Sequence, residues 1–186
     1  YKTIEELVAA AKEKGNLKAS TNGNKASNHT AAQLLAKSAG FKYKAIPYGG
    51  TADQLLALRQ GEVDFTCAKV ADVAKLVKGD KPELRVLAVF NTKRDPELPN
   101  VPTLGEKGLY PEWYGSARAL VAPKGTKPEV IQYYVEAFKK TMQDPAVIEA
   151  HKKAGMALDF KDNKELGDLI KAQDKFARDV VNDLYK

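Results

Sequence analysis

The sequence has 186 residues, of which 44% are hydrophobic and 29% are charged. This composition is typical of a globular chain with a buried core and excludes an intrinsically disordered one, and no stretch approaches the roughly 20 apolar residues that span a bilayer. The net charge of +6 fits either a solvated lysine-rich surface or attraction of anionic small molecules. Nucleic acid is a weaker alternative, because the basic residues are interleaved with acidic ones and form no block.

The first half of the sequence alternates predicted helices and strands. Capping-box patterns at Thr3-x-x-Glu6 and Thr51-x-x-Gln54 mark two helix starts, and Gly15, Gly40 and Gly61 mark helix ends. Helices are predicted at about 3–15, 29–39, 51–61 and 70–77, and strands at 17–21, 43–46, 63–67 and 85–90. Such alternation with short links is typical of an α/β sheet with parallel strands and right-handed crossovers.

The second half has a different character. Prolines and glycines punctuate residues 91–115, which also hold a short predicted helix from Thr103. Beyond them the sequence predicts strands at 117–122 and 156–160 and helices at 126–142, 144–155 and 162–184, the first of these with a Thr126-x-x-Glu129 capping box. These three helices have little sheet of their own to cover. We therefore expect a missing N-terminal part, or a partner chain, to supply it.

Candidate binding residues follow the first predicted strand. In α/β sheets, ligands bind beyond the carboxyl ends of strands, and a helix N-terminus with free N–H groups binds carboxylate or phosphate. The candidate residues of this loop are Thr21, Asn22, Gly23, Asn24, Lys25, Ser27, Asn28 and His29. The alternative is an ordinary loop in which Ser27 or Asn28 caps the following helix.

Two further strand ends carry candidate residues. Tyr48, Gly49 and Gly50 form a glycine turn before a helix, which serves either as a second anion site or as a turn alone. Lys69 follows the third strand, where its cation either meets an anionic ligand or is simply solvated.

Catalytic and metal-binding patterns are absent from the sequence. It has no nucleophile elbow, no phosphate-cradling loop and no zinc pattern, so no enzyme activity, cofactor or metal site is predicted. The single cysteine, Cys67, is expected to be a buried small side chain rather than a nucleophile paired with His29. His151 is expected to lie at the surface.

The order of several short segments resembles one known family. The segments that carry the resemblance are 2–8, 20–29, 47–52, 61–64, 84–89, 99–103 and 120–126. In these segments the sequence is similar to the tripartite tricarboxylate transporter substrate-binding proteins, also called the Bug family.

The resemblance implies a type II periplasmic-binding fold, with two α/β lobes that close on a ligand. It implies that residues 1–116 form one complete α/β lobe and that residues 117–186 belong to an incomplete other lobe, whose N-terminal half is missing. Family members hold one ligand carboxylate through loops at helix N-termini, partly by backbone amides and ordered water, and one such loop matches 21–29. The sequence departs from the family at Ala68-Lys69, at Gly49 and at Phe176, and Lys69 hints at an anionic distal group on the ligand.

The leading hypothesis is an extracytoplasmic or periplasmic solute-binding protein. It would capture a small organic anion, such as a di- or tricarboxylate, an amino acid or an aromatic acid, and deliver it to membrane transporter subunits. The alternatives are a ligand-sensing domain of a transcription regulator with the same fold and an enzyme on the same scaffold. An incomplete lobe would expose apolar surface, so a dimer or swapped assembly is also expected.

Overall fold

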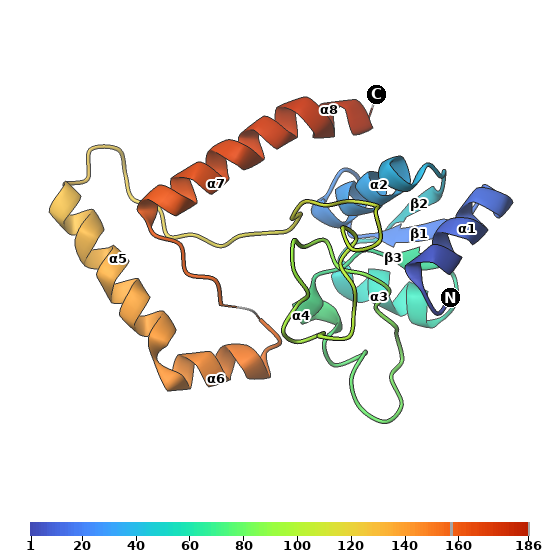
Figure 1. Cartoon of the computed structure of the whole chain (residues 1–186), viewed down its shortest axis with the longest axis horizontal. Coiled ribbons are helices and arrows are strands. Elements are labelled where there is room, and N and C mark those ends of the chain that lie inside the picture. The colour runs from blue at the N-terminus through green and yellow to red at the C-terminus, as the bar shows by residue number, and fades with distance from the viewer. Residues whose placement is uncertain (157, 186) are drawn as a thin grey trace. The chain divides into compact units, whose positions relative to one another are not determined.

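A computed structural model of the chain describes residues 1–156 and 158–185 (Figure 1). The chain divides into two compact units, Tyr1–Ser116 and Ala117–Lys186, and each is described by itself. Within the described residues, no helix combines the length and the apolar character that crossing a membrane requires.

The first unit is a three-layer α/β arrangement around a small sheet (Figure 1). The strand order is β2-β1-β3, and β1 pairs with both neighbours in parallel, as the alternating pattern predicted. Its elements are α1 (Ile4–Lys14), β1 (Lys18–Thr21), α2 (Ser27–Ala39), β2 (Lys44–Pro47), α3 (Thr51–Arg59), β3 (Phe65–Thr66) and α4 (Val70–Val73).

The two faces of β1 are packed differently, because successive side chains of a strand point to opposite sides. Ala19 joins the main hydrophobic core with Leu7 of α1 and Leu35 of α2. Ser20 points the other way, and its hydroxyl donates to the backbone carbonyl of Gln54 in α3 at 3.0 Å. The sheet therefore lies between α1 and α2 on one face and α3 on the other.

Only half of the capping box predicted for α1 forms. The Glu6 backbone N–H donates to the Thr3 hydroxyl at 3.2 Å, which caps the helix as predicted. The Glu6 carboxylate accepts from the Lys2 backbone N–H at 2.7 Å rather than from that of Thr3. The predicted capping box of α3 is wrong: its N-cap is Gly50, and no side chain caps it.

Two elements of the first unit are shorter than the sequence predicted, and a third is absent. The strand predicted at 63–67 is reduced to Phe65–Thr66, and the helix at 70–77 to Val70–Val73. The strand predicted at 85–90 is wrong, because the segment makes one isolated parallel bridge, between Val89 and Thr103, instead of a ladder. Leu87, Ala88 and Phe90 still pack against the core, so the apolar pattern of this segment reflects burial without strand pairing.

Helices make up the regular structure described in the second unit. They are α5 (Pro128–Gln143), α6 (Pro145–Lys153), α7 (Asn163–Phe176), the π-helical turn η1 (Ala177–Val181) and α8 (Asn182–Leu184). Asp144 caps α6 through the Ala146 N–H at 2.7 Å, and Asp162 forms a complete capping box with Glu165 at the start of α7. The predicted capping box of α5 is wrong, since Lys127 is the N-cap and the Thr126 hydroxyl donates to the Pro123 carbonyl instead.

Two predicted strands of this unit are not found. Ala117–Ala122 is exposed and forms no strand, because among the described residues nothing pairs with it. The strand predicted at 156–160 includes Ala157, which lies outside the described residues, and its other four residues are not in a strand. Apolar sequence alone does not make a strand where a neighbouring strand is lacking.

The helices of the second unit carry apolar side chains that remain exposed. None of the residues of α5, α6 or α7 is buried. The exposed large apolar side chains on these helices are Val130, Tyr133, Tyr134, Phe138, Ile148 and Ile170. Val130, Tyr134 and Phe138 follow one another at four-residue spacing and so form a stripe along α5.

Candidate functional site

Three loops leave the same edge of the sheet. They follow the carboxyl ends of β1, β2 and β3, which a parallel sheet brings to one side. The Tyr48 N–H donates to the Thr21 carbonyl at 2.9 Å, so the first two loops start side by side. The predicted site residues of these loops therefore lie at one edge, although that does not by itself make them contact one ligand.

The N-terminus of α2 is uncapped. The helix begins at Ser27, two residues earlier than predicted, and its N-cap is Ala26, whose side chain has no oxygen to accept from the first-turn amides. The alternative that Ser27 or Asn28 caps this helix is therefore wrong. The first turn of α2 also contains no acidic residue. The amides of this turn therefore have no capping side chain as a partner, and no carboxylate in the turn would repel an anion bound there.

The loop before α2 is held in a specific backbone shape. Gly23 has φ 125°, a conformation that side chains disfavour, and Lys25 adopts a left-handed φ of 59°. The Lys25 N–H donates to His29 Nδ1 at 3.0 Å, and the Thr21 hydroxyl donates to the Gly23 carbonyl at 3.3 Å. These two hydrogen bonds fold the loop back against the first turn of α2, while the Asn24 and Lys25 side chains remain exposed.

Several predicted ligand residues have buried side chains. Thr21, Asn28 and His29 are at most 5% exposed. Burial lowers the pKa of His29, which favours the neutral ring that accepts the Lys25 N–H. These side chains shape the loop from within, whereas Asn24, Lys25 and half-buried Ser27 are more accessible.

Asn22 carries a buried polar atom. Its Oδ1 receives no hydrogen bond from any residue in the described part of the chain. Buried acceptors are ordinarily satisfied by protein, water or a ligand.

The second loop is less suited to an anion. The Tyr48 hydroxyl donates to the Glu62 carboxylate at 3.1 Å, and Tyr48 has a raised pKa because of desolvation and this contact. Asp53 lies in the first turn of α3, and its Oδ2 would be 3.6 Å from a β-carbon placed on Gly49. A carboxylate thus already faces the N-terminus of α3, where a ligand anion at Gly49 and Gly50 would be repelled.

Lys69 offers a cation at the third loop. It is the N-cap residue of α4, it is exposed, and it belongs to no ion pair found among the described residues. Its ammonium is therefore available to an anion at this edge of the sheet.

A buried hydrogen-bond network connects the three loops. Its centre is Gln54, which is 0% exposed and which the sequence pattern placed in a capping box. Its side chain accepts from Asn28 Nδ2 at 2.9 Å and donates to the Thr66 hydroxyl and to the Cys67 carbonyl, the latter at 2.8 Å. The signal that points to this network is the pair of hydroxyl residues, Ser20 and Thr66, at adjacent strand ends.

The remaining chemistry-bearing residues do not form a reactive site. Burial raises the pKa of the Cys67 thiol to about 12, although the residue as a whole keeps some exposed surface, so the thiol stays protonated at neutral pH. His151 Nδ1 contacts the Val147 carbonyl at 2.9 Å, and the residue is half-buried rather than fully exposed. Within the described residues, no three His, Cys, Asp or Glu side chains gather as a metal site.

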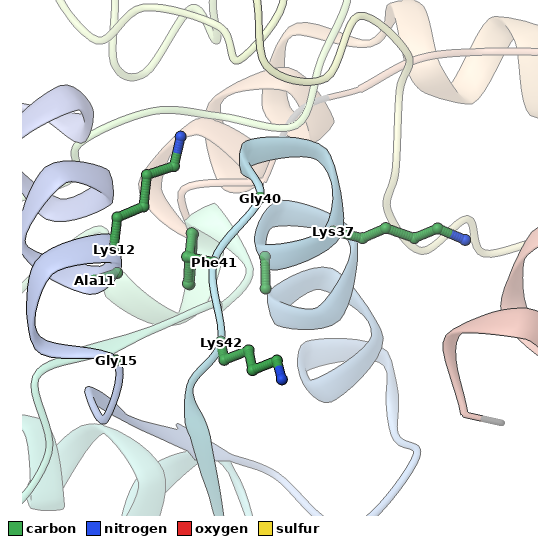
Figure 2. A pocket seen from close by; sticks show the side chains of 8 residues that line it. Ala11, Lys12, Gly15, Lys37, Gly40, Phe41 and Lys42 are labelled. Atoms are coloured by element: carbon green, nitrogen blue, oxygen red, sulfur yellow. The ribbon is translucent and has the colours of Figure 1, made fainter.

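A shallow hollow of about 460 Å³ lies at the opposite edge of the sheet. It is lined by the C-terminal ends of α1 and α2 and by Phe41 (Figure 2). Three lysines surround it, but Lys12, Lys37 and Lys42 point in different directions (Figure 2). Helix C-termini carry partial negative charge, so this hollow is not the predicted anion site.

Curated relatives match most of the chain. A protein encoded in the gbd 5' region of Cupriavidus necator is 37% identical over 145 residues, which cover 77% of this chain and 43% of the relative. BugT of Bordetella pertussis is 29% identical over 80% of this chain and 45% of its own length. The chain spans about half the length of the curated relatives it matches.

Solved structures share the fold. A TctC solute-binding protein from Polaromonas superposes with a TM-score of 0.85 at 27% identity, over 98% of this chain and 62% of that one. The Rpa4515 protein of R. palustris, solved with adipate, superposes with a TM-score of 0.79 at 22% identity, over 96% of this chain and 60% of that one. The α/β periplasmic-binding fold expected from the sequence is confirmed.

A family model for TctC, described as the tripartite tricarboxylate transporter family receptor, matches residues 1–184. The match covers both units and agrees with the resemblance read from the sequence. The chain belongs to the tripartite tricarboxylate transporter receptor (TctC) family, a family of solute-binding receptors.

Proposed function

We propose that this protein captures a small carboxylate at the N-terminus of α2 and delivers it to a membrane transporter of the tripartite tricarboxylate type. The observation that carries the proposal is the uncapped first turn of α2, which has no acidic residue and follows a loop whose backbone takes positive φ at Gly23 and Lys25. Its amides and the partial positive charge of the helix are suited to one carboxylate group.

The comparison of the two helix N-termini favours α2 over α3. Asp53 already occupies the first turn of α3, and the Tyr48 hydroxyl is engaged by Glu62. Lys25, in the loop before α2, and Lys69, after β3, are exposed and follow strands that end at the same edge of the sheet, so both add positive charge that raises the local concentration of an anion. The buried Oδ1 of Asn22 supports a role for a bound water next to the carboxylate.

The ligand class is inferred from chemistry and from a structure of similar fold. The Rpa4515 structure was solved with adipate, a dicarboxylate. In the present chain, the α2 amides would take one carboxylate and Lys69 a second anionic group. We therefore place di- and tricarboxylates first, with amino acids and aromatic acids as further candidates.

We also propose how the two units contribute. Residues 1–116 would form a complete lobe and residues 117–186 part of a second lobe, with the ligand held as the lobes close by hinge motion. Such a receptor would work in the periplasm or outside the cytoplasmic membrane, with transporter subunits as its partners. No observation favours the alternative role in transcription regulation.

A charge placed at the helix N-cap tests the proposal. Ala26 already has the extended backbone of an N-cap, so Ala26→Asp would cap α2 and stabilise it by about 1 kcal/mol. The same carboxylate would repel a ligand anion and weaken its binding about tenfold or more, because two charges about 4 Å apart interact by roughly 1–4 kcal/mol near a protein surface. Stability and affinity should change in opposite directions, as measured by thermal melts and calorimetry.

The panel for calorimetry is adipate with other di- and tricarboxylates, amino acids and aromatic acids, on the full-length protein. Lys127→Asp is the matched control, since Lys127 is the equally uncapped N-cap of α5. It should leave the affinity unchanged. A wild-type protein that binds no anion of the panel, or an Ala26→Asp variant that binds as tightly as wild type, would refute capture at α2.

A further inference from the structure

Gln54 is buried at the point where the three loops of the site meet. It occupies the fourth position of α3 and is 0% exposed. Its side-chain amide uses both of its donors and its acceptor: Oε1 accepts from Asn28 Nδ2 at 2.9 Å, and Nε2 donates to the Thr66 hydroxyl and to the Cys67 carbonyl. A glutamine with this bonding is held in one rotamer.

The same network reaches the end of β1. The Ser20 hydroxyl donates to the Gln54 backbone carbonyl at 3.0 Å, and the Thr66 hydroxyl donates to the Ser20 carbonyl at 2.9 Å. Gln54 thus connects the end of β1 through its backbone carbonyl, and the first turn of α2 and the end of β3 through its side chain.

The segments that Gln54 joins are those assigned to the anion. Asn28 lies in the first turn of α2, whose amides face the proposed carboxylate. Cys67 precedes Lys69 by two residues, so the Cys67 carbonyl fixes the chain just before the exposed cation. The spacing between the amides and Lys69 is therefore set through Gln54 rather than through the ligand.

We propose that Gln54 is the positioning residue of the anion site: it holds the first turn of α2 and the segment before Lys69 at a fixed spacing before the ligand arrives. This inference rests on the proposed function, because it assigns a role within the same site. Gln54 does not contact the ligand. It makes binding tighter because the protein does not have to order two loops at the moment of association.

Gln54→Met tests this role. Methionine keeps the length of the side chain and removes all three hydrogen bonds, so the loops lose their connection while the volume stays nearly constant. We expect affinity for the tightest-binding carboxylate of the panel, adipate included, to fall about tenfold, because ordering the two loops then becomes part of the cost of binding. Amide hydrogen exchange of residues 22–29 and 67–69 in the unliganded protein should speed up as well.

The exchange and affinity readouts separate positioning from a merely structural role. A structural role predicts a lower melting temperature but wild-type affinity in the folded protein at a temperature well below the transition. Gln60→Met is the matched control, because Gln60 is exposed at the other end of α3. It should change neither the affinity nor the exchange of these loops.

A second variant covers the case in which Gln54→Met does not fold. Thr66→Val removes one acceptor of Gln54 and leaves the Cys67 carbonyl in place, so a smaller loss of about threefold is expected. Wild-type affinity in whichever of these variants is folded would overturn the role of Gln54 and leave capture at α2 standing. A wild-type protein that binds no anion of the panel would remove both proposals.

Discussion

His29 couples the binding loop to pH. It is 5% exposed, and its Nδ1 accepts the Lys25 N–H at 3.0 Å, so that nitrogen must be unprotonated in the folded loop. This hydrogen bond also supports the left-handed backbone of Lys25, a conformation that costs a lysine roughly 1–2 kcal/mol. Protonation of the ring would remove the acceptor and leave a buried charge.

We expect stability to fall with acid through His29. Burial lowers its pKa in the folded protein below the ordinary value of 6.5, so its contribution is fully present above pH 6.5 and is lost as the pH falls below that value toward the folded pKa. In His29→Asn, the Asn Oδ1 replaces Nδ1 as a non-titrating acceptor. Thermal melts between pH 7.5 and 5 should show a shallower loss for His29→Asn than for wild type, and equal slopes would contradict the coupling.

The capping patterns show how an element can be recognised and its residues still misread. Four patterns of the Thr/Asp-x-x-Glu/Gln type precede helices in this chain, and each helix forms within two residues of the predicted start. Thr3 and Asp162 cap their helices, whereas Thr51 and Thr126 do not.

The difference between Thr3 and Thr51 is testable at the level of single helices. Thr3→Ala removes an observed cap and should lower the free energy of unfolding by about 1 kcal/mol. Thr51→Ala removes no cap and should change it by less than about 0.5 kcal/mol. Both residues lie in the first unit, so urea unfolding followed by the same probe compares them directly. Similar losses in the two variants would contradict the assignment.

The sequence therefore predicted local structure better than the contacts between elements. Helical periodicity and glycine stops located α1, α2, α3 and α5–α7, because these signals are local. The loop after β1 was located from its polar residues at a strand end. Gln54 was misread because its partners, Asn28 and Cys67, are 26 and 13 residues away, and only the sheet order β2-β1-β3 brings them together.

The strands predicted beyond Ser116 failed for a reason that belongs to the whole molecule. The segment 117–122 has the apolar composition of a strand but finds no strand to pair with among the described residues of its own unit. In the same unit, α5 exposes Tyr134 at 50% and Phe138 at 45%. A helix stripe of this kind usually faces a sheet or another chain, so this unit lacks a layer of its own to cover it.

A polypeptide of these 186 residues should accordingly associate in solution. The stripe of Val130, Tyr134 and Phe138 on α5 offers apolar area that self-association would remove from water, at about 25 cal/mol per Å². Tyr134→Lys combined with Phe138→Lys should shift the mass measured by light scattering toward the monomer and leave melting of the first unit unchanged.

Gln132→Lys is the control for this double substitution. Gln132 lies on the other side of α5 from the stripe, where its side chain donates to Glu136, so the variant should not alter the mass. A wild-type polypeptide that remains monomeric at about 100 μM, a concentration at which association with a Kd of about 1 μM would be nearly complete, would contradict the prediction.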